Sequence, residues 1–347
     1  MQKSKKFELG VYSFGNTPRN EDGSYASTAQ AIRDVLEAVK LAEEVELDYF
    51  GFGEHHTQSM PVSSPTSLVN AAAASTKRIK IGTTVSVLST DDPIRLFQQL
   101  STASAIAPGR IDIVAGRGSS DITFALFDKN PNDYDTLFAS KLELLLELNK
   151  HERLTWNGGH RQNPLVEKLI VPRPEEPIKI WLGTGGSAGS VYRAAELGVP
   201  MFLGILGGTP QHWAQYGLAY RDAWAKAGHP ADAAEVAVAV HGFVGEDDSV
   251  AKRTYLKYES QMFMTGSAEI GRPMRAPVGR EADLEKMVFA GSPEQIADRI
   301  IQFHRLLGQS RQIIQMDVGG MPQKTFLKSI ELLGTKVLPK IRAALGD

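Results

Sequence analysis

The chain has 347 residues, a net charge of −2, an isoelectric point near 6.5 and a mean hydropathy of −0.20. These values describe an ordinary globular protein, without the basic excess that favours nucleic acid or an apolar run of the roughly 18 residues that span a membrane. Cysteine is absent, which excludes disulfides, thiolate metal sites and a cysteine nucleophile. We expect a cytoplasmic protein, because its charged N-terminus also does not resemble a signal peptide.

Short apolar segments rich in β-branched residues alternate along the chain with segments of helical length. The segment at 79–87 is followed by Asp92-Pro93, an N-cap with proline at the first helical position, and Pro108-Gly109 ends the helix. The apolar segment at 111–115 completes a β-α-β unit, which implies parallel strands covered by helices. Strands are predicted at 7–13, 49–53, 79–87, 111–115, 178–182, 199–205, 236–244 and 312–318, and a closing helix at 325–345.

Eight parallel strands with helices between them close most naturally into a (β/α)8 TIM barrel, because an open sheet would leave two edges to cover. We predict a single α/β domain over residues 1–347, with its ligand site at the carboxyl ends of the strands. The segments 121–177 and 245–291, after strands four and seven, are too long for ordinary loops. We expect them to form lids or extra elements over that face.

A glycine-rich turn follows the fifth predicted strand, where Gly183-Thr184-Gly185-Gly186-Ser187 opens a helix. Glycines let backbone amides approach an anion, and the helix N-terminus adds unpaired donors, so this turn predicts a phosphate site. With Ala188 it also fits the G-x-G-x-x-A dinucleotide fingerprint, but the acidic residue expected about 20 positions later is missing. One phosphate is therefore better supported than a dinucleotide. A glycine turn without a ligand is the alternative.

Two other strand ends carry polar residues. The second strand runs into EHH at 54–56, where one histidine could act as a donor or proton shuttle or could simply pack at the strand end. Adjacent strand residues point to opposite faces, so the pair is poorly placed to bind one metal, and we predict no metal site. The fourth strand ends in GRGS at 116–119, whose Arg117 could reach a phosphate or form a buried ion pair.

Six motifs occur in a characteristic order. They are FGFGEHH (50–56), RIKIGTTVSVLSTDDPIRLFQQL (78–100), APGRIDIVAGRGS (107–119), the glycine/serine turn before RAAELGVP (193–200), GSPEQIADRI (291–300) and SIELLGTKVLPKIR (329–342). Each motif is weak alone, but together they resemble the bacterial luciferase-like family of flavin-dependent monooxygenases. The resemblance covers nearly the whole chain.

The resemblance implies a (β/α)8 barrel that binds reduced FMN, or in some branches the deazaflavin F420, at the carboxyl ends of the strands. By position, His55 matches the active-site histidine, and a non-proline cis peptide is implied between Thr84 and Val85. Gly116 stands where the light-emitting luciferase subunit has a reactive cysteine, which argues against light emission. The cofactor-binding residues implied are Thr83, Thr84 and Val85 along the ring, and Arg117, Gly185, Gly186, Ser187 and Ser190 at the phosphate.

The implied function is that of an FMN-dependent monooxygenase, an oxidoreductase that uses externally supplied reduced flavin and O2 to oxidise a small organic substrate. No second, NAD(P)H-binding domain is recognisable, so we expect a separate NAD(P)H:flavin reductase as partner. An F420-dependent hydride-transfer enzyme and a non-catalytic flavin-binding relative are the alternatives. We also expect a homodimer formed through the helices near 65–76 and 93–107, and a substrate pocket lined by both insertions and the loop at 14–25.

Overall fold

The computed structural model describes residues 6–20, 22–118, 121–159, 161–269, 284 and 286–346. A closed barrel of eight parallel strands forms its centre, and each strand pairs with the next until the last returns to the first. The strands are β1 (Glu8–Ser13), β2 (Tyr49–Phe52), β3 (Lys80–Val87), β4 (Ile111–Gly116), β7 (Lys179–Thr184), β8 (Met201–Ile205), β9 (Val236–Val244) and β11 (Arg311–Gln315). The predicted TIM barrel is confirmed. The last strand ends at Gln315, earlier than predicted, because its ladders to β1 and β9 stop there.

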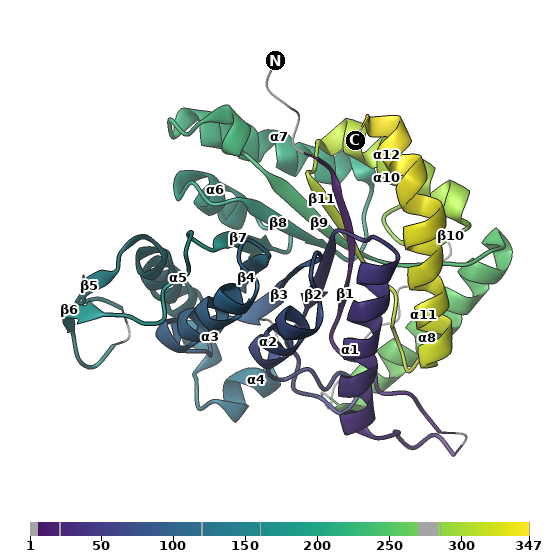
Figure 1. The fold of residues 1–347 in the computed structure, drawn as a ribbon, viewed down its shortest axis with the longest axis horizontal. Coiled ribbons are helices and arrows are strands. Elements are labelled where there is room, and N and C mark those ends of the chain that lie inside the picture. Colours follow the sequence, from purple (N-terminus) through teal and green to yellow (C-terminus); the bar gives the residue numbers. More distant parts are fainter. Residues whose placement is uncertain are drawn as a thin grey trace.

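Helices surround this barrel (Figure 1). They are α1 (Thr28–Glu44), α2 (Pro65–Ser75), α3 (Pro93–Ile106), α5 (Tyr134–Lys150), α6 (Ala188–Glu196), α7 (Pro210–Lys226), α10 (Pro293–Leu307), α11 (Gln323–Leu332) and α12 (Leu338–Leu345). The predicted cap of α3 is confirmed, because the Asp92 side chain accepts the amides of Ile94 and Arg95. The predicted closing helix is interrupted by a π-helical turn, Leu333–Val337. Pro339 follows that turn and has no amide hydrogen for the carbonyl four residues earlier.

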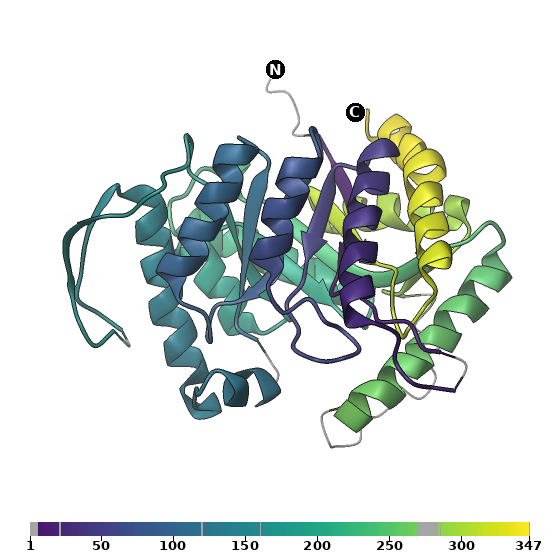
Figure 2. The same ribbon diagram turned by 60° about the horizontal axis from the view of Figure 1, so that its bottom comes forward.

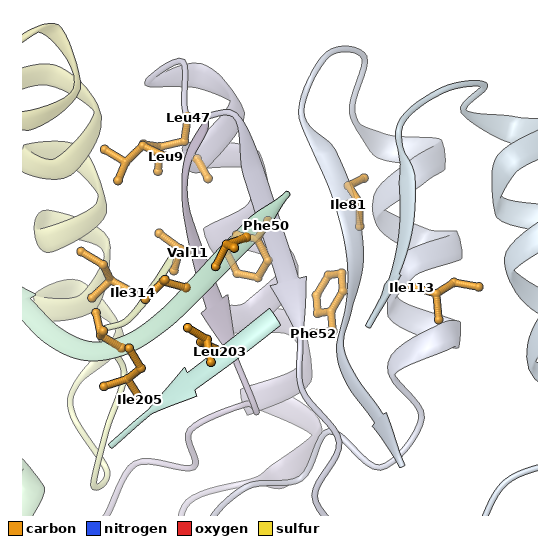
Figure 3. Close-up of a cluster of buried hydrophobic side chains, with 14 of the residues drawn as sticks. Leu9, Val11, Leu47, Phe50, Phe52, Ile81, Ile113, Leu203, Ile205 and Ile314 are labelled. Carbon is orange, nitrogen blue, oxygen red and sulfur yellow. The ribbon is translucent and has the colours of Figure 1, made fainter. Parts of the chain in front are cut away.

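Two separate cores follow from the alternation of side chains along the strands. Outward-facing side chains pack beneath the helices, and Figure 3 shows a group of them, among them Leu9, Phe50, Ile81, Ile113 and Ile314. A second, smaller cluster fills the barrel itself: Tyr12, Tyr49, Val114, Trp181, Phe202, Ala237, Ala239 and Ile313. The interior is therefore packed, and a ligand has room only above it, at an end of the barrel.

A buried ion-pair network lies inside the barrel near the start of the strands. Arg311 is 1% exposed, and its Nε donates to Glu8 at 2.7 Å while its Nη1 lies 2.7 Å from an Asp112 oxygen. The guanidinium also lies 4.0 Å from the ring centroid of Tyr49. Burial alone would raise the pKa of Glu8, but the charges of Arg311 and Lys80 lower it to about 2. Arg311 and Asp112 thus stabilise each other in the buried interior, while Glu8 and Lys80 connect the network to the partly exposed end of the barrel.

The two insertions differ from what we expected. The first contains α4 (Asp121–Leu126) and a hairpin of β5 (Arg153–Trp156) and β6 (Leu165–Leu169). Of these elements, α4 lies at the carboxyl ends of the strands, whereas the hairpin lies along α5 at the outer edge of the molecule (Figures 1 and 2). The prediction that this insertion covers the carboxyl face is therefore wrong for the hairpin. The second contains α8 (Asp248–Glu269) and β10 (Phe289–Gly291), which extends the pairing of β9. Residues 270–283 and 285 of this insertion lie outside the described residues.

One general property concerns membranes. Within the described ranges, no helix is both long enough and apolar enough to cross a bilayer.

Candidate active site

The predicted site residues lie together because of the order of the strands. β2, β3, β4 and β7 are consecutive neighbours in the barrel, about 4.8 Å apart in the direction of their hydrogen bonds. The loops that carry His55, Arg117 and Ser187 therefore leave the barrel from one side of the same rim. Figure 2 shows that α4, the end of α8 and the loop at 14–25 project at this end.

His55 is held in the loop that follows β2. Its backbone amide donates to the Val62 carbonyl at 2.9 Å, and its ring packs edge-on against Phe14 with 4.7 Å between centroids. Burial, and then the neighbouring His56, lower the pKa of His55 to about 4, against the opposing charge of Glu54. At neutral pH the imidazole is therefore uncharged. It can donate one hydrogen bond and accept another, but it holds no imidazolium proton to release.

The adjacent histidine has different partners. His56 Nε2 lies 3.0 Å from Glu54 Oε1, and its ring contacts Phe127 at 5.1 Å between centroids. The other Glu54 oxygen accepts the amide of Val87 at 2.8 Å. Glu54 thus joins the end of β2 to the end of β3 and orients His56. The sequence run at 54–56 combines one candidate catalytic residue with two that organise the rim.

The middle of β3 contains a cis peptide bond between Thr84 and Val85, as the family resemblance implied, and this prediction is confirmed. Thr84 faces the barrel interior, where its hydroxyl lies 3.1 Å from that of Tyr49. Thr83 is fully buried on the opposite face, and its hydroxyl accepts the amide of Val114. Of the three residues predicted along the flavin ring, only Thr84 and Val85 therefore present side chains to the interior.

Gly116, at the end of β4, lies directly against Val85. A Cβ atom at this position would come within 2.2 Å of Val85 Cγ2. The space that a cysteine side chain would need at position 116 is therefore already filled by Val85.

The glycine turn after β7 forms an open cradle in front of α6. Ser187 caps the helix, because its hydroxyl oxygen accepts the amide of Ser190 and lies 2.8 Å from the Ser190 hydroxyl. Gly186 has a φ of +88°, and a Cβ there would lie 2.7 Å from the ring of Trp213. By contrast, a Cβ on Gly185 or Gly189 would meet nothing within 4 Å. The space around Gly185 and Gly189 at the start of α6 is thus open, and a helix N-terminus with open space in front of it suits an anion such as a phosphate.

Arg117 follows β4, the strand beside β7. Its Nη1 lies 3.1 Å from an oxygen of Asp135, whose side chain is 68% exposed, and its guanidinium lies over the ring of Tyr134. This is not the buried ion pair that we considered as the alternative. An ion pair with so exposed a carboxylate contributes only about 0–1 kcal/mol. The role of Arg117 at a phosphate stays a prediction. Ser119 of the same motif lies outside the described residues.

A polar network that the sequence analysis missed joins three segments of the rim. The Glu269 carboxylate, at the end of α8, accepts the amide of Ser59 at 2.8 Å and the hydroxyl of Tyr25 at 3.1 Å. Arg19 donates to Tyr25 and to Thr265 of α8. These contacts tie the loop at 14–25 and the His55 loop to α8. No local pattern could reveal them, because their partners are up to 246 residues apart.

A parallel barrel that carries an anion cradle and a neutral histidine at its carboxyl rim defines a TIM-barrel enzyme of the cofactor-binding kind. The model of the luciferase-like monooxygenase family matches residues 12–310, and the chain belongs to this family. It is thereby one of a group of flavin-dependent oxidoreductases. Along its length it is similar to the uncharacterized protein y4vJ of Sinorhizobium fredii (strain NBRC 101917 / NGR234), with 26% identity over 341 residues that cover 93% of this chain and 95% of the relative.

Solved structures share the fold. The monooxygenase RslO1 from Streptomyces bottropensis superposes with a TM-score of 0.83 at 20% identity, over 96% of this chain and 99% of that one. The oxygenating constituent of 3,6-diketocamphane monooxygenase from Pseudomonas putida, in complex with FMN, gives 0.75 at 19% identity, with the same coverage. The coenzyme F420-dependent tetrahydromethanopterin reductase from Methanopyrus kandleri gives 0.72 at 16% identity, over 97% and 99%. Identities this low establish a common fold and no more.

Proposed function

We propose that the protein is an FMN-dependent monooxygenase that receives reduced FMN and uses O2 to oxidise a small organic substrate. The observation that carries this proposal is the open cradle at the N-terminus of α6, with Arg117 on the neighbouring strand. Within the luciferase-like family, a single-phosphate cradle suits the one terminal phosphate of FMN.

The residues present fit this cofactor. The first-turn amides of α6, the Ser187 hydroxyl and the Arg117 guanidinium would hold the phosphate, with Gly185, Gly186 and Ser190 shaping the cradle. Thr84 and Val85 form the part of the barrel floor over which the flavin ring would lie. When bound, reduced FMN supplies the electrons for the reaction with O2. His55 would offer a neutral donor and acceptor beside it, and the network around Glu269 would help to keep water out.

Titration of the purified chain with FMN, and with reduced FMN under anaerobic conditions, tests the cradle. We expect Arg117→Ala and Ser187→Ala each to weaken the binding of reduced FMN by about tenfold or more, because each removes a hydrogen bond to a charged group. Ser27→Ala is the matched control, since Ser27 caps α1 in the same way and should cost a similar stability, about 1 kcal/mol, without affecting flavin. Equal binding by all three variants and the wild type would refute the cradle.

F420-dependent hydride transfer is the second candidate, because the barrel of an F420-dependent reductase superposes over nearly all of this chain. This activity would need the same rim but no oxygen. Parallel titration with F420 distinguishes the two. Binding of F420 in preference to reduced FMN would move the function to oxygen-independent hydride transfer.

Two partners belong to the proposal. A separate NAD(P)H:flavin reductase would deliver the reduced FMN, so the purified chain should not turn over with NADH alone. A homodimer would form through α2 and α3, which pack against each other on one side of the barrel. Sedimentation of the purified protein tests the second point.

A further inference from the structure

Asp317 is a buried carboxyl group that the proposed function leaves unused. It lies two residues beyond β11 and is 3% exposed. Its Oδ2 accepts a short hydrogen bond from the hydroxyl of Ser13, at the end of β1, and that hydroxyl in turn accepts the amide of Gly15 at 2.9 Å. In the described part of the chain, Oδ1 is buried and has no hydrogen-bond partner. Burial of an unpaired carboxylate oxygen is costly, so this oxygen favours a proton.

A small cavity adjoins this carboxyl group. Its volume of about 20 Å³ is enough for one ordered water molecule. Asp317 forms part of one wall, and the other walls come from the loop at 14–25, the His55 loop and α8, with Arg19, Ser59 and Thr265 among the lining residues. The carboxyl group and the loop that carries His55 therefore border the same small, partly open cavity at the rim.

The surroundings of Asp317 favour its neutral form. Burial raises the pKa of Asp317 to about 7, and the hydrogen bond from Ser13 opposes this shift only in part. The nearby titratable or charged groups are Tyr12 of β1, Arg19 and Tyr25 of the loop at 14–25, His241 of β9 and Glu269 of α8. Arg19 directs its donors to Gly23, Tyr25 and Thr265. Near neutral pH, a substantial fraction of the molecules thus carries a proton on Asp317.

We propose that Asp317 supplies the proton that monooxygenation consumes, an inference that rests on the proposed function. Anionic reduced flavin, O2, the substrate and one proton together give oxidised flavin, the oxygenated substrate and one water. His55 is uncharged at neutral pH and has no imidazolium proton to give. A water molecule held in the cavity would take the proton as the O–H bond of Asp317 breaks and would pass one of its own protons toward the O2-derived oxygen that leaves as water. The carboxylate would then regain a proton from solvent. Asp317 acts through this water and is therefore a positioning residue.

The protonation of Asp317 can be measured without any cofactor. Infrared difference spectra of the full chain, recorded against pH, should show the carbonyl band of a protonated carboxyl group that disappears with a midpoint near 7. Asp317→Asn should remove this band. Ser13→Ala should move its midpoint upward, because the Ser13 hydroxyl stabilises the charged form. Asp91→Asn is the control, because burial also raises the pKa of the Asp91 carboxyl group, and it should leave the band in place. A carboxyl group at position 317 that titrates in the ordinary range near 4 would overturn the proposal.

Stability offers a second readout that needs no flavin. The folded pKa of about 7 lies above the unfolded value of about 3.9. Between these values the native state holds a proton that the unfolded chain has lost, so this group lowers stability as pH rises from about 4 to 7. Asp317→Asn should remove that slope and be more stable than the wild type at pH 8. An unchanged slope would count against the assignment.

The role toward the flavin is tested by stopped-flow oxidation of bound reduced FMN by O2. We expect Asp317→Asn to keep its affinity for reduced FMN within about threefold but to lose the rate inflection near pH 7, with the rate at neutral pH falling by about tenfold or more. Asp317→Glu should restore an inflection at a shifted pH. A wild-type pH profile in Asp317→Asn would overturn the role. If the wild type binds no reduced FMN, the proposed cofactor is wrong, and Asp317 then has no flavin reaction to supply with a proton. The infrared titration would still show whether Asp317 is protonated.

Discussion

Replacing Arg311 with methionine is expected to destabilise the protein by roughly 3–5 kcal/mol, the range for breaking a buried ion pair by removing one partner. Methionine can fill much of the space between Tyr49 and Trp181, so lost packing is the smaller part of the effect. The larger part is that the carboxylate of Asp112 stays buried without a counter-charge, while Glu8 keeps only Lys80. Urea unfolding at pH 7 measures the change.

Arg342→Met is the control, because Arg342 is 25% exposed, its partner Glu46 is 73% exposed, and its second partner, the buried Asp48, keeps Lys6 as a counter-charge. It should cost about 1 kcal/mol or less. Adding Glu8→Gln and Asp112→Asn to Arg311→Met should recover much of the stability, since no unpaired charge then remains in the barrel. If Arg311→Met lowers the free energy of unfolding by no more than Arg342→Met does, the buried ion pair does not stabilise the barrel.

The same network makes the free energy of unfolding depend on pH. The folded pKa of Glu8, about 2, lies below its unfolded value of about 4.3. Its contribution to stability is therefore present at neutral pH and is lost as pH falls from about 4 toward 2. Without Arg311 this contribution is smaller, because only Lys80 is left to lower the pKa of Glu8, so the gap in free energy of unfolding between the wild type and Arg311→Met should narrow over that window. A gap independent of pH would contradict the electrostatic explanation.

Replacing His55 with alanine is expected to lower turnover by roughly 10²–10⁴-fold, the usual contribution of a positioned acid–base group. Binding of reduced FMN should be retained, because the cradle lies after β4 and β7 while His55 follows β2. The assay supplies a separate flavin reductase, NADH and a panel of small organic substrates, and any product formed by the wild type is then followed in the variant. A protein that only binds flavin would have no turnover to lose.

His56→Gln is the control for this experiment, since His56 is turned toward Glu54 and Phe127. We expect a loss of stability at the ends of β2 and β3 but turnover within a few-fold of the wild type.

The pKa of His55 gives this prediction a second test. His55 is neutral above about pH 4, so its replacement should leave any inflection near pH 7 in place while lowering the rate throughout. Its folded pKa also lies below the unfolded value of about 6.5, so it lowers stability as pH falls from 6.5 to 4. His55→Gln should remove that loss. Disappearance of the inflection near pH 7 in His55→Ala would instead assign that titration to His55.

Local sequence determined the barrel and much of its rim. Runs of β-branched residues located the strands, and β9 has the predicted bounds because both of its faces are buried and it opens with the apolar run VAVAV. The capping residues Asp92 and Ser187 act through amides within three residues along the chain, so their helix starts could be predicted from composition. The family motifs added the cis peptide at Thr84–Val85 and His55, whose catalytic role stays a prediction.

Tertiary structure decided what depends on distant neighbours. The hairpin of β5 and β6 was missed because its two strands are short and mostly exposed, so they contain too few apolar positions to predict a strand. The orientation of Thr83 away from the barrel interior was set by the register of β3 against β4. Burial and interactions with distant residues also set the pKa values of the charged groups. Glu8 meets Arg311 across 303 residues and Asp317 meets Ser13 across 304, so neither the low pKa of one carboxyl group nor the raised pKa of the other is visible before the chain folds.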